Sequence, residues 1–212
     1  FDDNARSFLT TIQKNTNQMS NIVNDMLQLT RLQEKPLGTD LPAVNATKSF
    51  LAAWEPCLPL AEEKDTRLEN DLPGSLMVKA DEVALIRVFR NLIDNAVRYS
   101  SPGGTISVSA GEKENEIIFA IRDEGPGIPQ KHQNRIFERF YRIDKERSRA
   151  SGGTGLGLSI CKNAVNSMQG RIWVESPPKG AAKGSEFFFS LPRTAASPVH
   201  GKTDQTDHEQ EG

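Results

Sequence analysis

The stretch DEVALIRVFRNLIDNAVRYS, residues 81–100, is the part of the sequence that decides the expected fold. An acidic first turn favours a helix start, and one face of the helix is apolar. The residues of that face are Ile86, Phe89, Ile93, Ala96 and Val97. Asn91, Asn95 and Arg98 follow one another at spacings of four and three, so they form a polar stripe. The segment predicts an amphipathic helix from Asp81 to Tyr99 with a buried face and a polar stripe.

Helices and strands are expected to alternate around this central helix. The expected helices are Lys48 to Lys64, residues 155–168 and the short aromatic segment NRIFERFYR, residues 134–142. The expected strands are Thr66 to Leu72, Leu76 to Val78, residues 105–110 and 116–122 as a hairpin around the turn GEKEN, Arg171 to Glu175, and Glu186 to Leu191. This alternation predicts a mixed α/β (α+β) domain over residues 41–192.

The N-terminal segment has a different pattern. Phe8, Ile12, Asn15, Met19, Ile22, Met26 and Leu29 alternate at spacings of four and three, which is a heptad seam. Leu9, Val23 and Leu27 widen the stripe, which favours a helix of a four-helix bundle over residues 1–35. A helix packed on its own globular domain is the alternative. Residues 36–40, with Pro36 and Gly38, form a linker, and the polar segment 193–212 is expected to be disordered.

Composition excludes several classes of function. Against 28 acidic side chains there are 26 basic ones, so a net charge of -2 gives no electrostatic case for binding nucleic acid or a membrane surface. No apolar run approaches the roughly 20 residues of a membrane span. The two cysteines lack metal-ligand spacing and are expected to be small buried side chains in a reducing cytosol. Together these features predict a soluble segment.

Three motifs carry the expected chemistry. The amide oxygens of Asn91 and Asn95 can complete an octahedral Mg²⁺ whose charge nucleotide phosphates balance, and Arg98 can clamp a phosphate oxygen. In DEGPGI, Asp123 can accept a hydrogen bond from an exocyclic amine, while Gly125 and Gly127 let the backbone approach a flat ring. Each motif alone also fits a plain alternative, a solvated helix face for the first and an Asp-Gly turn for the second.

The third motif is GGTGLGLSI, residues 152–160, a glycine-rich loop that runs into a helix. Such a loop presents unpaired backbone N–H groups to an anion. It matches neither GxxxxGK[ST] nor a GxGxxG that follows a first strand. A lid hinged on glycines is the functional interpretation, and a flexible loop is the alternative.

The order NLIDNAVRYS, DEGPGI, RIFERFYR, GTGLGLSI and GSEFFFSLP resembles the N box, first glycine box, F box, second glycine box and closing strand of sensor histidine-kinase catalytic domains. The resemblance covers residues of roughly 40 to 192 and implies a Bergerat-type two-layer sandwich of a mixed sheet and helices that binds ATP. It implies Mg²⁺ at Asn91 and Asn95 and adenine recognition by Asp123. The implied ATP-binding residues are Asn91, Asn95, Arg98, Tyr99, Asp123, Gly125, Gly127, Ile128, Arg142, Thr154, Gly155, Leu156, Gly157, Leu158 and Ser185.

Residues 1–35 resemble the second helix of the dimerisation and phosphotransfer hairpin of that family. The phosphate-accepting histidine belongs to the first helix, which this sequence does not contain. His132, His200 and His208 lack the family context and are expected to be surface residues, so no catalytic residue is assigned to this chain. The segment is expected to bind Mg-ATP without phosphorylating itself, and a processed or truncated chain is implied.

The resemblance also implies partners and a location. The parent protein would form a homodimer, pass phosphate to a response regulator receiver domain, and lie in the cytoplasm, with an inner-membrane anchor in N-terminal segments absent here. An ATP hydrolase of the gyrase or heat-shock-chaperone type is the alternative. Those enzymes place a glutamate four residues before the second asparagine, where this chain has Asn91 and so lacks a proton-accepting carboxylate. A non-catalytic interaction module is a third possibility.

Overall fold

A computed structural model describes residues 41–143 and 154–194, together with isolated helical positions between Ala5 and Val23. Among those positions, Phe8, Ile12 and Met19 of the predicted heptad seam are helical and 70%, 60% and 67% exposed. The rest of that seam, the linker 36–40, and residues 195–212 of the predicted tail lie outside the described residues. Of the described helices, none is long and apolar enough to cross a membrane.

Helices and strands alternate through the described domain, as the sequence predicts. The helices are α2 (Ala46–Trp54), a 3-10 turn η1 (Glu55–Cys57), α3 (Leu58–Glu63), α4 (Glu82–Tyr99), α5 (Gln130–Gln133) and α7 (Gly157–Ser167). The strands are β1 (Ala43–Asn45), β2 (Arg67–Asn70), β3 (Met77–Lys79), β4 (Thr105–Lys113), β5 (Glu116–Asp123), β6 (Ile172–Glu175) and β7 (Ser185–Pro192).

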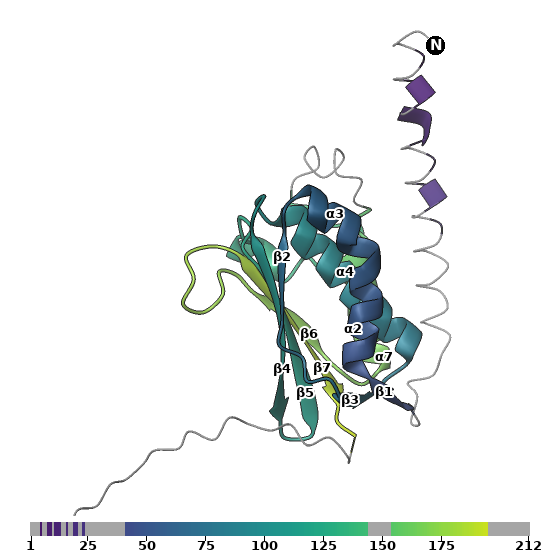
Figure 1. Cartoon of the computed structure of the whole chain (residues 1–212), viewed down its shortest axis with the longest axis vertical. Coiled ribbons are helices and arrows are strands. Elements are labelled where there is room, and N and C mark those ends of the chain that lie inside the picture. Colours follow the sequence, from purple (N-terminus) through teal and green to yellow (C-terminus); the bar gives the residue numbers. More distant parts are fainter. Residues whose placement is uncertain are drawn as a thin grey trace, which may run out of the picture.

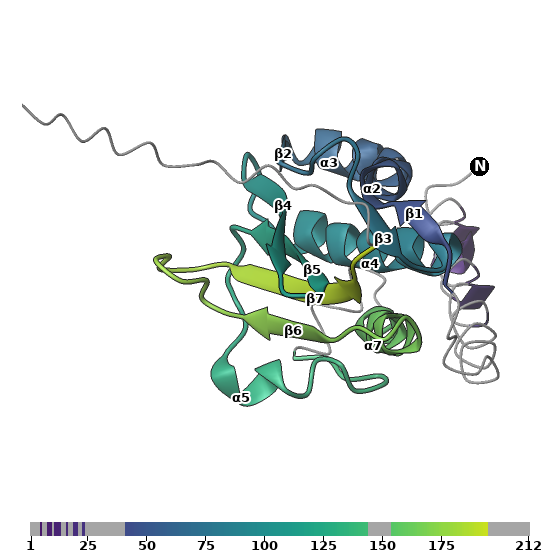
Figure 2. The same ribbon diagram turned by 90° about the horizontal axis from the view of Figure 1, so that it is seen from below.

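The main sheet has five strands in the order β2-β4-β5-β7-β6. β2 runs parallel to β4, and the remaining pairs are antiparallel, so the sheet is mixed as expected. β1 and β3 form a separate antiparallel pair. Figures 1 and 2 show α2, α4 and α7 covering one face of the five-stranded sheet, which makes the domain a two-layer sandwich.

Four phenylalanines join the two layers. Phe89 of α4 meets Phe50 of α2, Phe119 of β5 and Phe189 of β7 edge to face, with ring centroids 5.3–5.5 Å apart. All four side chains are fully buried. Edge-to-face contacts of this kind add stability beyond the burial of apolar area. Helix α4 is therefore anchored on β5 and β7 in the interior of the sheet.

Side chains form hydrogen bonds with backbone groups at both ends of α4. Asp81 caps the N-terminus by accepting a hydrogen bond from the backbone N–H of Ala84 at 3.0 Å. At the C-terminus, Nζ of Lys64 donates to the carbonyl oxygens of Val97, Arg98 and Ser100 at 2.7, 2.7 and 2.8 Å. A cation at this end also complements the helix dipole.

Several local predictions were wrong. The segment NRIFERFYR is not a helix but a series of turns that follows the short α5, and Phe140 within it has a positive φ of 61°. The helix expected from Lys48 to Lys64 is interrupted by η1, where Pro56 lacks an N–H for the helical ladder. The turn GEKEN is shorter than expected, because β4 continues to Lys113. Strand β1 was not predicted.

Two further predictions, on the start of the tail and on the cysteines, can be compared with the structure. Arg193 and Thr194, which the sequence places in the tail, pack on the domain: Arg193 bridges Val78, and the hydroxyl of Thr194 donates to the carbonyl of Met77. The expectation of buried cysteines is confirmed, since Cys57 and Cys161 are free thiols that are 5% and 0% exposed.

Candidate functional site

Asp123 lies at the end of β5 on the face of the sheet that the helices cover. Burial alternates strictly along this strand, which puts Asp123 in register with Ile117, Phe119 and Ile121 and leaves it 4% exposed. Its Oδ1 accepts the backbone N–H of Gly125 at 2.8 Å, and the backbone N–H of Ser185 also donates to the carboxyl. Burial raises the pKa of Asp123 to about 6, and the two backbone hydrogen bonds lower it in part.

The loop after Asp123 runs directly against the C-terminus of α4. A Cβ on Gly125 would lie 2.7 Å from the carbonyl oxygen of Tyr99, so only glycine permits this approach. Tyr99 itself is 47% exposed at the end of the helix. The loop and the end of α4 therefore border the buried carboxylate together.

Ser185 faces Asp123 across the β5–β7 pair and is 4% exposed. The sequence resemblance implies that its hydroxyl supports the aspartate. In the structure it is the backbone N–H of Ser185 that donates to Asp123. A Cβ on the preceding Gly184 would lie 2.3 Å from the carbonyl oxygen of Asp123, which keeps the two strands close here.

The two asparagines of the central helix lie half-buried on successive turns of α4. Asn91 contacts α7, because a Cβ on Gly157 would lie 3.0 Å from Oδ1 of Asn91. The N-terminus of α7 therefore lies over Asn91. Asn95 lies one turn nearer to Tyr99 and Asp123.

Arg98 is not directed along the asparagine stripe. Its Nε donates to Oδ2 of Asp94 at 2.6 Å, one turn earlier on the same helix. This hydrogen bond is the main reason why the pKa of Arg98 lies above its usual value. The guanidinium of Arg98 is therefore paired with Asp94, and its contact with a phosphate stays a prediction.

The glycine-rich segment is held by the turns of the F box. The backbone N–H of Phe140 donates to the carbonyl of Gly155 at 2.9 Å, and Gly155 has a φ of +74°. A Cβ there would lie 3.0 Å from the Phe140 backbone. Leu156 is fully buried, and its N–H is satisfied by the hydroxyl of Thr154. These contacts fix where α7 begins.

The start of α7 has features of an anion site. No side chain caps it, although the helix has 11 residues. Arg142 lies at the end of the neighbouring F-box turns. Its Nη2 is buried without a hydrogen-bond partner within the described part of the chain. Arg142 also packs on the same loop, with its Cγ 3.3 Å from where a Cβ of Gly155 would be. Gly157 and Leu158, in the first turn of α7, are half-buried.

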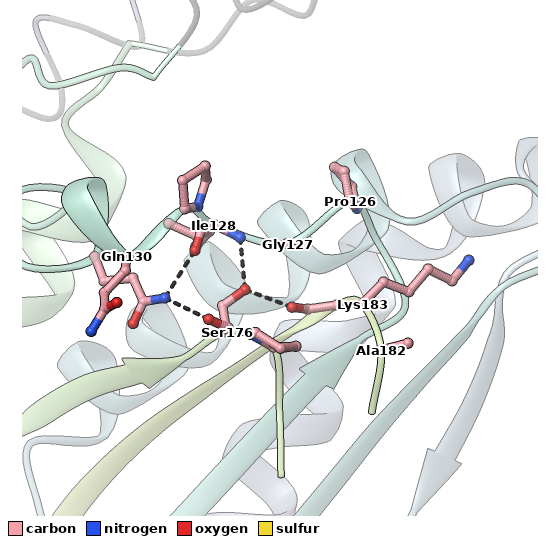
Figure 3. Close-up of a pocket in the computed structure, with 11 residues that line it drawn as sticks. Pro126, Gly127, Ile128, Gln130, Ser176, Ala182 and Lys183 are labelled. Carbon is pink, nitrogen blue, oxygen red and sulfur yellow. Dashed lines mark hydrogen bonds between the residues drawn. The ribbon is translucent and has the colours of Figure 1, made fainter. Parts of the chain in front are cut away.

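A pocket of about 530 Å³ lies between the DEGPGI loop, α5 and the β6–β7 connection (Figure 3). Of the predicted site residues, it contains only Gly127 and Ile128. Its other lining residues are Pro126 and Pro129 of the loop segment and residues of α5 and the β6–β7 connection, among them Gln133, Ser176 and Lys183. Sequence reasoning missed Ser176, which directly precedes cis-Pro177, and Gln133 of α5, because neither residue belongs to a recognisable motif.

Residues 80–195 match the model of the histidine kinase-, DNA gyrase B-, and HSP90-like ATPase family. The chain belongs to this ATP-binding family. Within it, the relatives are sensor kinases: sensor histidine kinase WalK of Bacillus subtilis is 36% identical over 193 residues, which is 90% of this chain and 31% of WalK.

Solved structures agree with this assignment. Mycobacterial sensor histidine kinase MprB superposes with a TM-score of 0.63 at 28% identity, over 73% of this chain and 98% of that one. Full-length ShkA, in complex with AMPPNP, gives a TM-score of 0.72 at 27% identity, over 92% of this chain and 40% of that one. The resemblance to sensor histidine-kinase catalytic domains and the two-layer fold are confirmed. The chain spans about a third to a half of the length of the curated relatives it matches.

Proposed function

We propose that this domain binds Mg-ATP and is the part of a sensor histidine kinase that presents the γ-phosphoryl group to a histidine elsewhere in the parent protein. The observation that carries the proposal is the buried Asp123 carboxylate, bordered by a glycine loop that touches the end of α4. A buried acid with a raised pKa in such a setting is a typical binding-site feature.

The adenine would lie against this loop. The carboxylate of Asp123 would accept a further hydrogen bond from the exocyclic amine, and the Gly125–Ile128 backbone would border the ring. The residues fit this ligand, because Gly125 leaves no side chain between the loop and Tyr99. Tyr99, exposed at the end of α4, would flank the nucleotide.

The phosphates would lie at the start of α7. Its uncapped N–H groups favour an anion, and the buried, unpartnered Nη2 of Arg142 lacks the acceptor that a phosphate oxygen would supply. Gly155, Leu156 and Gly157 bring the backbone to this point, with Thr154 bracing the turn and Leu158 packed against the core. Arg98 would contact a phosphate oxygen once its ion pair with Asp94 has opened.

Asn91 and Asn95 would hold Mg²⁺. Two neutral amide oxygens fit an ion that takes its remaining ligands from phosphate oxygens and water. When bound, such an ion neutralises charge on the phosphates that are being transferred. The chain's own residues orient the nucleotide and exclude water from its base.

The acceptor of the phosphoryl group would be a histidine on another helix. His132, within the described residues, hydrogen-bonds Tyr141 through Nδ1 at 2.6 Å and lies on α5. We therefore expect no acid-labile phosphate on this chain after incubation with labelled ATP. Phosphate on His132 would contradict that expectation. Rapid hydrolysis would instead favour the gyrase-type alternative, for which Asn91 provides no general base.

The helical segment that precedes the domain supports the partner proposals. Its described apolar positions Phe8, Ile12 and Met19 are largely exposed in the single chain. Pairing of such stripes between two chains would build a homodimeric bundle in the parent protein. A response regulator receiver domain would take the phosphoryl group from that bundle.

ADP titration by calorimetry in the presence of Mg²⁺ tests the proposal. Wild type is expected to bind, and Asp123→Asn is expected to weaken the affinity by about tenfold or more, since a hydrogen bond to a charged group is lost. Asp71→Asn, a change at an exposed carboxyl, is the matched control. If wild type does not bind ADP at millimolar concentration, the proposed function is wrong.

A further inference from the structure

Ser176, the residue after β6, connects two segments that are far apart in sequence. Its hydroxyl accepts the backbone N–H of Ile128 at 2.7 Å and donates to the carbonyl of Gly184 at 2.7 Å (Figure 3). One side chain thus ties the DEGPGI loop to the segment that enters β7.

Gln133 of α5 reinforces the same junction. Its Nε2 donates to the carbonyl of Ile128 at 2.9 Å and to the carbonyl of Ser176 at 2.6 Å. Ile128 therefore has both its N–H and its C=O held by side chains from other segments. Nε2 can make both contacts because it carries two donor hydrogens and both of its partners are acceptors.

Glycines keep the junction closed. A Cβ on Gly127 would lie 2.9 Å from the Ser176 hydroxyl and 3.0 Å from the carbonyl of Gly184, and Gly127 has a φ of +80°. The loop and the β7 entry therefore approach each other with no side chain between them. Movement of one segment would strain the hydrogen bonds to the other.

The two tied segments are those that donate to Asp123. Gly125 belongs to the loop that Ser176 holds at Ile128, and Ser185 follows Gly184, whose carbonyl Ser176 also holds. We propose that Ser176, assisted by Gln133, is a positioning residue that fixes the two backbone donors around Asp123 and so sets the geometry of adenine recognition. This inference rests on the proposed function and assigns Ser176 no contact with the nucleotide.

The test compares Ser176→Ala with Ser190→Ala in ADP binding. Ser190 is the matched control, since its hydroxyl accepts the N–H of Arg171 at the opposite end of the β6–β7 pair, away from Asp123. Both variants are expected to lower the melting temperature of the nucleotide-free chain by a few degrees. Only Ser176→Ala is expected to weaken ADP binding, by about tenfold. Gln133→Leu should weaken it in the same direction by about threefold.

A double-mutant cycle separates positioning from a general loss of structure. If Ser176 acts through Asp123, adding Ser176→Ala to Asp123→Asn should cause little further loss of ADP affinity, as measured by saturation-transfer NMR at millimolar ADP. Fully additive losses, or ADP binding by Ser176→Ala within twofold of wild type, would overturn the inference while the proposed function stands. Absence of ADP binding by wild type would refute both.

Discussion

Arg98 and Asp94 form an ion pair along the outer side of α4, with Nε 2.6 Å from Oδ2 and the two side chains 37% and 40% exposed. Exposed pairs of this kind contribute about 0–1 kcal/mol, so the pair can open at little cost when a stronger anion is present. The pairing makes Asp94 a competitor for the guanidinium that the phosphate role would need.

The first prediction concerns the effect of removing the Asp94 carboxylate on Mg-ATP binding. Asp94→Ala should strengthen Mg-ATP binding by about two- to threefold, because Arg98 no longer has to leave a carboxylate. Arg98→Ala should weaken it. Arg90→Ala, at an exposed position of the same helix, is the control for a change of net charge. Equal Mg-ATP affinity of Asp94→Ala, Arg98→Ala and wild type, measured by calorimetry, would show that Arg98 does not reach the nucleotide.

The second prediction concerns the pH dependence of ADP binding. The pKa of Asp123 is raised to about 6, and only its ionised form can accept a hydrogen bond on both oxygens. ADP affinity should therefore be constant above about pH 7 and fall up to tenfold per unit below about pH 6. Because ADP phosphates also titrate near this range, adenosine is the better probe. An adenosine affinity that does not change from pH 8 to pH 5 would argue against Asp123 as the adenine acceptor.

The third prediction concerns stability without nucleotide. A pKa that folding raises from 3.8 to about 6 means that the folded state holds the proton more tightly. This contribution to stability is complete below about pH 4 and is lost as the pH rises through about 6. The side chain at position 123 of the variant Asp123→Asn does not titrate. The unfolding free energy of Asp123→Asn minus that of wild type should therefore increase by up to about 3 kcal/mol between pH 4 and pH 7.5.

Urea unfolding at several pH values measures this difference directly. Asp71→Asn is the control for the general effect of pH on the domain, since Asp71 is exposed. The predicted gain would be absent if water or a neighbouring cation solvated the Asp123 carboxylate in the folded state.

The fourth prediction separates two glycines of the same motif. Gly155→Ala should destabilise the fold by about 1–2 kcal/mol, because the position has a positive φ and the new Cβ meets the Phe140 backbone. Gly157→Ala should leave stability nearly unchanged, since alanine suits a helix, but should displace Asn91, 3.0 Å away, and weaken Mg-ADP binding.

Thermal unfolding and calorimetry on the two variants distinguish these effects. Gly111→Ala, where an added Cβ meets nothing within 4 Å, is the neutral control. Should Gly157→Ala bind Mg-ADP as wild type does, the contact between α7 and Asn91 would have no part in holding the metal.

Much of the fold is predictable because it rests on local patterns. The burial of Asp123 follows from strict alternation along β5, and α4 follows from helical periodicity with Asp81 as its cap. The segment NRIFERFYR shows where this reasoning fails. Its aromatic spacing suits a helix, yet the backbone of Phe140 pairs with Gly155 and adopts a positive φ that no helix allows.

The chain's sequence by itself determined the order of elements, the family of ATP-binding domains and the set of candidate residues, because periodicity and glycine spacing act over short distances along the chain. Only the tertiary structure decided which of those groups meet. The ion pair of Arg98 with Asp94 lies within the single helix α4. Asn91 meets the start of α7, and Ser176 joins the loop of Gly125 to the entry of β7, because contacts between segments that are far apart in the sequence depend on how the two layers pack.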